Sequence, residues 1–437
     1  MKIERLLVFG KETFLVATGQ AGSALGGLFG IYMLTHLLDP DEYGALALAM
    51  TLSAFIQQVV IGPISFAALR FYVAASEANT LPEYLAAIKM ESGTRIRLLA
   101  IVGLLASLCM LLLGWQPEGK LAATSVFFGL FSSYSSIIEG IQTGARRRGI
   151  VALHMTLGTF LRFAFAGLIV VAFAPTSAAA MSGFAIAAML ILTSQSYFLN
   201  LKIKKGCDLS QKELWAWRTR IKDYTWPFSI WGVPAWLQVS SERWALKASG
   251  SSYEVGLFSV LYQVGYYPIS LLITVITQAV APVLLGKASM EVTHDRQKEI
   301  ITLSRISFWT VLVITAFGLG LAYWWGDSIF RILTDEDYHE ATRYLVWMVL
   351  AAGLFGANQI IEIMILAGQD SSKLLFPKLL FAGTGITLNI LLSYFWGMAG
   401  IIAANIFASC VFMAILLHLA RLKIIALNNT GGLEIRR

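Results

Sequence analysis

The residues from Leu379 to Ala420 read LLFAGTGITLNILLSYFWGMAGIIAANIFASCVFMAILLHLA, without a single Asp, Glu, Lys or Arg. A helix needs about 20 mostly apolar residues to cross the hydrocarbon core of a bilayer. This stretch is therefore too long for one span, and Trp396-Gly397 near its middle predicts a break between two spans. We expect a pair of transmembrane helices here.

The rest of the chain has the same apolar character. Of its 437 residues, 57% are hydrophobic and 14% are charged. Soluble domains usually carry about 45–50% apolar and about 25% charged residues. The composition excludes a disordered chain, a coiled coil and a nucleic-acid-binding module, and it argues against a soluble multidomain enzyme. The sequence therefore predicts a polytopic protein whose surroundings are the lipid bilayer, and no nucleic acid is expected as a partner.

Further charge-free stretches follow one another along the chain, and the one from Phe163 to Leu201 also divides, at Pro175-Thr176-Ser177. With both divisions, the chain contains twelve predicted spans. They form an N-terminal six-helix bundle over residues 1–200 and a C-terminal six-helix bundle over residues 225–437. The expected fold class is an all-α integral membrane protein made of these two bundles.

Residues 201–224 form the predicted linker between the bundles. In this segment Trp215 and Trp217 alternate closely with Arg218 and Arg220. Tryptophan favours the headgroup region and arginine favours lipid phosphate, so a short helix lying in the membrane interface fits the pattern. A plain solvated linker is the alternative.

The basic residues predict the orientation in the membrane. Most of the 33 Lys and Arg residues lie in alternate connections, whereas the other connections are short and acidic, as at Asp39, Asp41 and Glu42. Basic connections stay in the cytoplasm. Both termini and the linker are therefore predicted to be cytoplasmic. The net charge of +7 follows from this orientation and is not by itself a sign of a polyanionic partner.

The two halves show traces of an internal repeat. Glu42-Tyr43-Gly44 opens the second predicted span, and Glu254-Val255-Gly256 opens the eighth. Glu139 late in span 4 has a counterpart in Glu362 late in span 10. Because each half has an even number of spans, such repeats are related by an axis along the membrane normal, as in several transporter folds.

Two longer motifs carry a family resemblance. The run Leu37-Leu38-Asp39-Pro40-Asp41-Glu42-Tyr43-Gly44 after a Gly/Ala-rich first span resembles the opening of the polysaccharide-transporter family (Wzx-type O-antigen flippases). That family belongs to the multidrug/oligosaccharidyl-lipid/polysaccharide (MOP) superfamily. Ser241-Glu242-Arg243-Trp244, followed by Tyr253-Glu254-Val255-Gly256, is similar to its span 7–8 signature. The family usually has Asp-Arg there, so Glu242 is a departure.

The resemblance implies a fold and a function. The fold would be that of the MOP and MATE transporters, with two bundles that rock by alternating access. The substrate would be an oligosaccharide linked to undecaprenyl pyrophosphate, such as an O-antigen, capsule or exopolysaccharide repeat unit. It would move from the inner to the outer leaflet of the bacterial cytoplasmic (inner) membrane. Glycan polymerase and other assembly proteins are the partners that this function implies.

Charged residues inside the spans are the candidate site. A charge within a span is costly, so it usually faces a protein interior or a water-filled cavity. Arginine's planar fork suits the oxygens of a pyrophosphate, which favours a cationic substrate cavity. The structural alternatives are that Arg243 pairs with Glu242, and that the cations near span ends reach the interface. The candidate cations are Arg162, Arg243, Lys247, Arg70 and Lys378.

Carboxylates and amides inside the spans complete the candidate set. Glu139 and Glu362 are candidates for H⁺ or Na⁺ coupling, or are structural partners of basic residues. Intramembrane amides are candidate sugar contacts, although such groups are more often hydrogen-bonded links between helices. Gly22-x3-Gly26-x3-Gly30 predicts the close approach of another helix to the first span. The amides are Gln57, Gln238, Gln263, Asn358, Gln359 and Asn389.

Two other functions compete with the flippase. A cation-coupled multidrug or small-molecule antiporter of the same superfamily should favour carboxylates over arginines in its cavity. A membrane glycan polymerase or ligase generally places catalytic residues on a large outside loop, and the outside loops here are short. The sequence has no metal cluster, Walker A motif or nucleophile elbow. We therefore expect no enzyme activity, no metal and no cofactor beyond a coupling ion.

Overall fold

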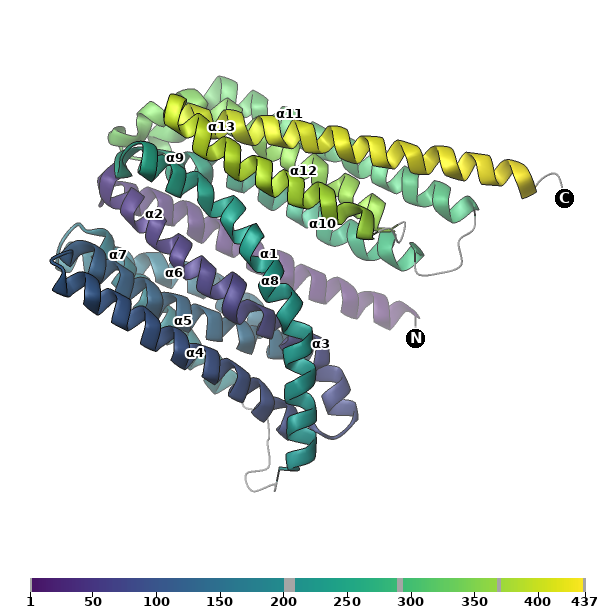
Figure 1. Cartoon of the computed structure of the whole chain (residues 1–437), viewed down its shortest axis with the longest axis horizontal. Helices are drawn as coiled ribbons and strands as arrows, with labels where there is room; N and C mark the ends of the chain where they lie inside the picture. Colours follow the sequence, from purple (N-terminus) through teal and green to yellow (C-terminus); the bar gives the residue numbers. More distant parts are fainter. Residues whose placement is uncertain (1, 200–208, 289–293, 368–370, 435–437) are drawn as a thin grey trace. The chain divides into compact units, whose positions relative to one another are not determined.

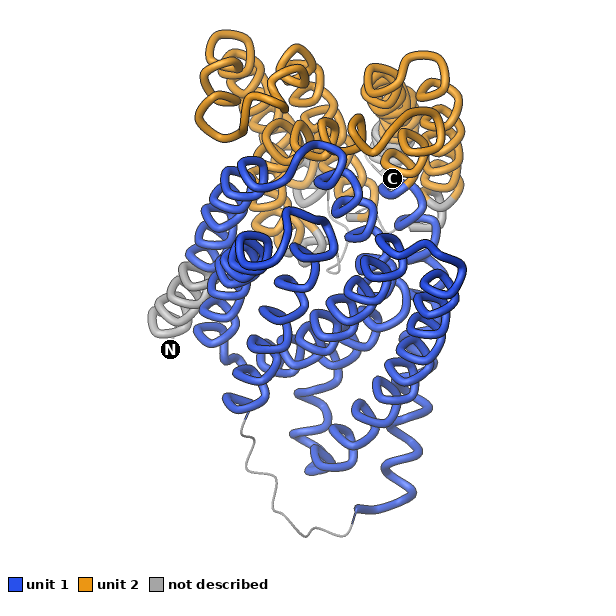
Figure 2. Tube along the Cα trace, turned by 90° about the vertical axis from the view of Figure 1, so that its left-hand side faces the viewer, with its two compact units in different colours: residues 1–240 blue, residues 241–437 orange. Residues whose placement is uncertain are grey.

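The computed structural model describes residues 2–199, 209–288, 294–367 and 371–434, and in these ranges the chain forms helices joined by short connections (Figure 1). The helices divide into two compact units, Met1–Ser240 and Ser241–Arg437 (Figure 2). Each unit is described by itself.

Unit 1 contains the first seven α-helices and most of the eighth. Helices α2 and α3 are joined without a break by a short π-helix, η1, so that Pro40–Glu77 is one continuous helix. The elements are α1 (Lys2–Thr35), α2 (Pro40–Phe55), η1 (Ile56–Ile61), α3 (Gly62–Glu77), α4 (Leu81–Leu112), α5 (Gln116–Gly144), α6 (Arg148–Ala172), α7 (Ser177–Phe198) and α8 (Gln211–Ser249).

Unit 2 repeats the pattern of a helix interrupted by a π-helical turn. Its elements are α9 (Ser252–Leu261), the π-helix η2 (Tyr262–Tyr266), α10 (Tyr267–Ala288), α11 (His294–Leu333), the 3-10 helix η3 (Glu336–Tyr344), α12 (Leu345–Ala367) and α13 (Ser371–Glu434).

Helix α13 is broken at Gly397, which has φ 55° and ψ −132°. Positive φ is accessible to glycine at little cost, because glycine has no Cβ. The chain reverses there, and the two arms, 371–396 and 398–434, lie side by side (Figure 1). The break that Trp396-Gly397 predicted between two helices is therefore confirmed.

Nine helices of the described ranges are long and apolar enough to cross a membrane, so the chain is a multi-pass membrane protein. One of the nine, Phe376–Arg421, includes both arms of α13, whereas α1 and α8 are not among them. The predicted count of twelve spans and the cytoplasmic termini stay predictions. The nine are Pro40–Glu77, Leu81–Leu112, Gln116–Gly144, Arg148–Ala172, Ser177–Phe198, Ser252–Ala281, Glu299–Leu333, Glu336–Leu366 and Phe376–Arg421.

The internal repeat has a structural counterpart. Asp39 caps the N-terminus of α2 by accepting a hydrogen bond from the Glu42 N–H, and Ser251 caps α9 by accepting one from the Glu254 N–H. Each helix then runs into a π-helical segment, η1 or η2, and resumes as an α-helix with a proline near its start. The two segments with related sequences therefore have the same order of elements: a capped α-helix, a π-helical segment and a second α-helix.

The two acidic residues of these segments also contact equivalent places. In unit 1, Glu42 Oε2 accepts a hydrogen bond of 2.6 Å from the backbone N–H of Ser177, the first residue of α7. In unit 2, a Cβ added at Gly397 would lie 3.0 Å from Glu254 Oε2. Each carboxylate therefore reaches the start of the last predicted span of its own half.

Glycines let α1 and α6 approach closely. A Cβ at Gly22 would lie 2.6 Å from Thr156, and one at Gly30 would lie 2.3 Å from the Phe163 ring. Ser23 Oγ and Thr159 Oγ1 are also hydrogen-bonded across this contact, at 2.8 Å. The partner helix that the doubled GxxxG pattern predicted is α6.

The predicted domain bounds and linker stay a prediction, and the two compact units are divided at another place. The division falls between Ser240 and Ser241, inside α8, rather than within residues 201–224. Residues 200–208 lie outside the described ranges, and from Gln211 onward the chain is helical. Leu214 and Trp217 are buried against α3 and α4, and Trp217 Nε1 donates a hydrogen bond of 3.0 Å to Thr80 Oγ1. Apolar burial therefore makes this segment part of unit 1.

Candidate functional site

Arg162 of unit 1 lies on α6 and is half-buried. Its guanidinium carbon is 4.8 Å from the centre of the Phe163 ring and 5.4 Å from that of Phe184 on α7. A guanidinium within about 6 Å of an aromatic ring is attracted by the negative face of the ring. Two rings of the α6–α7 contact therefore hold this predicted cation in place.

Arg243 of unit 2 has a similar aromatic setting. It lies half-buried on α8, and its guanidinium carbon is 5.2 Å from the Tyr262 ring and 5.9 Å from the Phe258 ring. Its Nε donates a hydrogen bond of 3.3 Å to Ser259 Oγ. The side chain is thus held by α9 and η2, the helix that carries the second copy of the repeat.

Glu242 does not form a salt bridge with its neighbour Arg243 within the described part of the chain. Its carboxylate is buried, and Oε1 accepts a hydrogen bond of 2.9 Å from Asn405 Nδ2 on the second arm of α13. Sequence reasoning missed Asn405 and Ser259. Asn405 carries the same signal as the predicted amides, an amide inside an apolar stretch, whereas a serine on a helix gives no comparable signal.

Two buried oxygens of this region, one of them on the same carboxylate, are unpartnered in the described ranges. Glu242 Oε2 and Asn389 Oδ1 have no hydrogen-bond partner among the residues that the structure describes. Asn389 Nδ2 donates a hydrogen bond of 3.0 Å to Ser241 Oγ, on the residue before Glu242. A buried acceptor without a donor costs free energy, so these oxygens are suited to receive a donor or a cation.

The remaining predicted cations are dispersed. Lys378 on α13 forms a salt bridge of 2.8 Å with Glu362 on α12. Lys247, exposed near the end of α8, donates a hydrogen bond of 2.7 Å to Ser252 Oγ. Arg70 is exposed on α3, 5.1 Å from the Tyr224 ring. Each of these three cations therefore has a contact of its own. Lys378 and Glu362, which were predicted for different roles, form a salt bridge with each other.

Glu139 differs from the other interior carboxylates. It is half-buried on α5, and no hydrogen-bonding or ion-pair partner is found for it in the described ranges. The same face of α5 carries Ser136 and Gln142, whose side chains bond to neighbouring helices. Glu139 thus lies on a polar face of α5, and no ion pair joins it to Arg162 in the described ranges.

The predicted sugar-binding amides mostly connect helices. Asn358 Nδ2 donates to the Ser409 backbone oxygen at 3.0 Å, which joins α12 to α13, and Asn389 joins α13 to α8. Gln57 Nε2 donates to Ser136 Oγ at 3.1 Å and joins η1 to α5. Gln263 Nε2 bonds within its own helix, to the Ser259 backbone oxygen at 3.4 Å. The other two amides, Gln238 and Gln359, are half-buried.

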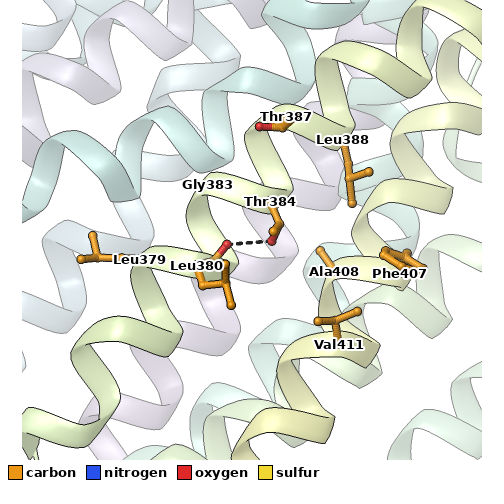
Figure 3. A pocket seen from close by; sticks show the side chains of 9 residues that line it. All are labelled: Leu379, Leu380, Gly383, Thr384, Thr387, Leu388, Phe407, Ala408 and Val411. Atoms are coloured by element: carbon orange, nitrogen blue, oxygen red, sulfur yellow. Dashed lines mark hydrogen bonds between the residues drawn. The ribbon is translucent and has the colours of Figure 1, made fainter.

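A pocket of about 450 Å³ lies between the two arms of α13 (Figure 3). Its polar hydroxyl at Thr384 donates to the Leu380 backbone oxygen at 2.7 Å, within its own helix. None of the predicted charges lines it, so it is an apolar pocket and not the predicted cationic cavity. The lining residues are Leu379, Leu380, Gly383, Thr384, Thr387, Leu388, Phe407, Ala408 and Val411.

Comparison with known proteins defines the fold. No family profile matches the chain, and no curated protein matches it. Lipid II flippase MurJ, in an inward closed conformation, superposes with a TM-score of 0.74 at 16% identity, covering 93% of this chain and 87% of MurJ. An inward-facing multidrug resistance MATE transporter of the MOP superfamily gives 0.66 at 16% identity, covering 94% of this chain and 96% of the transporter.

A third similar structure is an outward-facing multidrug resistance MATE transporter of the MOP superfamily, with a TM-score of 0.60 at 16% identity, covering 96% of this chain and 97% of the transporter. Together these likenesses show the fold: the chain has the all-helical architecture of the MOP superfamily transporters and of MurJ. The predicted MOP/MATE-like fold is therefore confirmed, whereas the Wzx-type family stays a prediction.

Proposed function

We propose that the protein is a flippase, which moves an oligosaccharide linked to undecaprenyl pyrophosphate from the inner to the outer leaflet of the bacterial cytoplasmic membrane by alternating access. The observation that carries the proposal is the setting of Arg243. This guanidinium lies inside an apolar unit, and aromatic rings and a hydroxyl hold it, while the adjacent carboxylate bonds to Asn405 instead.

Such an arginine suits a diphosphate substrate. The guanidinium donates in a planar fork that matches phosphate oxygens, and hydrogen bonds between charged groups are roughly twice as strong as neutral ones. Arg162, which lies over two rings of unit 1, would serve the same chemistry. The likeness to MurJ, a lipid II flippase, supports a lipid-linked substrate. Glycan polymerase and assembly proteins remain proposed partners on the same reasoning.

A cation-coupled multidrug antiporter is the second candidate. The likeness to MATE transporters and the interior carboxylate of Glu139, for which the described residues provide no partner, favour it. An antiporter needs a carboxylate that binds either the cation or the drug, and Glu139 has the burial for that role. The two candidates predict different cargo, so a single deletion strain distinguishes them.

Deletion of the gene is expected to make lipid-linked oligosaccharide accumulate on the inner leaflet. The lipid would be extracted and measured by mass spectrometry, and its leaflet assigned with a membrane-impermeant label on intact and on inverted vesicles. Complementation with the wild-type gene should restore the outward-facing lipid. If the lipid pool stays normal while susceptibility to cationic drugs rises, the antiporter is the correct function.

We further propose that ion coupling, by H⁺ or Na⁺, acts at Glu242. Its Oε2 is buried without a hydrogen-bond partner in the described ranges, while Asn405 donates to Oε1 of the same carboxylate, which leaves one oxygen available to a cation. Of the two carboxylates predicted for coupling, Glu362 is engaged by Lys378, whereas Glu139 remains a candidate.

Glu242→Gln should leave transport measurable in proteoliposomes but independent of an imposed H⁺ or Na⁺ gradient, because the substitution keeps the shape and removes the charge. Glu362→Gln is the matched control and should keep the gradient dependence, because Lys378 already engages that carboxylate. A Glu242→Gln protein that still responds fully to both gradients would exclude this assignment.

A further inference from the structure

One end of unit 1 carries two arginines from different helices on a shared aromatic ring. Arg70 is on α3 and Arg220 is on α8, and their guanidinium carbons lie 6.0 Å and 4.9 Å from the centre of the Phe71 ring. Because both distances end at the same ring, the two guanidinium carbons are at most about 11 Å apart. Both side chains are exposed, whereas Phe71 is only 7% exposed.

A second ring supports each guanidinium. Arg70 lies 5.1 Å from the Tyr224 ring, and Arg220 lies 5.3 Å from the Trp217 ring. The two rings pack on Phe71, with centroids 5.2 Å and 6.1 Å from its own. Trp217 is buried and hydrogen-bonded to Thr80, so the platform is fixed to the core of the unit. The arginines are therefore positioned by rings that carry no charge.

Neither positive charge is neutralised by a carboxylate in the described ranges. The exposed acids nearest in sequence, Glu77 and Asp223, form no salt bridge with them. The neighbouring Arg218, by contrast, forms a salt bridge of 2.6 Å with Glu91. Arg218 is thus engaged in a local ion pair, whereas Arg70 and Arg220 are exposed and lie near aromatic rings.

A fourth arginine of this region, Arg95, also donates its hydrogen bonds to protein groups. Arg95 Nη1 donates a hydrogen bond of 2.8 Å to the backbone oxygen of Val60, and Nη2 donates one of 3.1 Å to Thr225 Oγ1. Arg218 and Arg95 are thus bonded to protein groups, whereas Arg70 and Arg220 contact aromatic rings. This difference separates Arg70 and Arg220 from the general excess of positive charge.

We propose that Arg70 and Arg220 form a phosphate-binding site on unit 1, which takes a diphosphate or the phosphate of an anionic phospholipid headgroup. Two forked donors that share one ring can contact one anion together, and arginine binds phosphate in two-pronged geometry. The site lies on the end of unit 1 where the basic residues predict the cytoplasm. Capture of a transported substrate there would rest on the proposed function, whereas phosphate binding itself does not.

The test uses the full-length protein in nanodiscs and two probes. The first arm measures binding of inorganic pyrophosphate by calorimetry in discs of phosphatidylcholine alone. The second arm measures, by native mass spectrometry, how much phosphatidylglycerol the protein retains from mixed discs. The variants are Arg70→Gln/Arg220→Gln and the matched control Lys212→Gln/Lys222→Gln, which removes two exposed charges from α8 without touching the rings.

We expect the arginine double variant to lose at least tenfold in one or both arms, and the lysine double variant to change by less than twofold. Loss in the first arm identifies a free or substrate diphosphate, and loss in the second identifies a lipid headgroup. Arg70→Lys/Arg220→Lys should lose binding partially, because it keeps the charge but not the fork. Equal losses in the arginine and lysine double variants, or no loss in either arm, would overturn the proposal.

Discussion

Arg243→Ala is expected to abolish surface polysaccharide while leaving the amount of protein in the membrane unchanged. The substitution removes the guanidinium that Tyr262, Phe258 and Ser259 hold inside unit 2. A hydrogen bond to a charged group contributes about 1.5–3 kcal/mol, so loss of a phosphate contact should slow transport by about tenfold or more. Arg162→Ala should have the same effect from unit 1. Glycan display would be measured by surface labelling, and insertion by immunoblot of membranes.

Two controls make this result specific. Lys247→Ala removes an exposed cation one turn further along α8 and should leave glycan display near the wild-type level. Arg243→Lys keeps the charge but loses the planar fork, and it should be intermediate. Normal display by both Arg162→Ala and Arg243→Ala would refute the cationic-cavity hypothesis.

Gly183→Val is expected to prevent accumulation of folded protein. A Cβ at Gly183 on α7 would lie 2.4 Å from the backbone nitrogen of Ala166 and 2.5 Å from its Cα, so the two helices would have to separate. Overpacking a core usually costs about 1–3 kcal/mol, and the cost rises where backbone is the obstacle. The measurement is the yield of monodisperse protein after solubilisation, together with its thermal unfolding midpoint.

Gly27→Val is the matched control, because a Cβ at Gly27 on α1 meets no heavy atom within 4 Å. Both substitutions place valine in a helix interior, so the difference between them reports the α6–α7 contact and not helix propensity. If the two variants gave the same yield and midpoint, close packing at Gly183 would not be required for folding.

Features that follow from local chemistry could be predicted from the sequence. Charge-free stretches indicate apolar helices, Gly397 marks the reversal in α13, and the spaced glycines of α1 mark the contact with α6. Counting charge-free residues does not give the start of a helix where charged residues are also helical. One charge-free stretch begins at Leu98, but the helix that contains it, α4, begins at Leu81. The charged residues of its first half are bonded within unit 1: Glu91 pairs with Arg218, and Arg95 bonds to neighbouring helices.

The candidate site was predicted residue by residue but not in its pairings. An arginine or glutamate in an apolar stretch is visible in the sequence, so Arg162, Arg243 and Glu362 could be named as candidates, and their role stays a prediction. The partner depends on which helices pack together, and a contact such as Glu242 with Asn405 joins residues far apart in the chain. The two rings around each arginine were likewise beyond prediction, because aromatic residues are common in every span.

The π-helical segments η1 and η2 also decide which residues of the following helices face their neighbours. A π-helical turn inside an α-helix accommodates an additional residue, and one residue turns everything beyond it by about 100° around the helix axis. The segments follow equivalent capped starts in both units and precede Pro63 in one and Pro268 in the other. The residues of α3 and α10 therefore present faces turned by about 100° from those that an uninterrupted α-helix would give them.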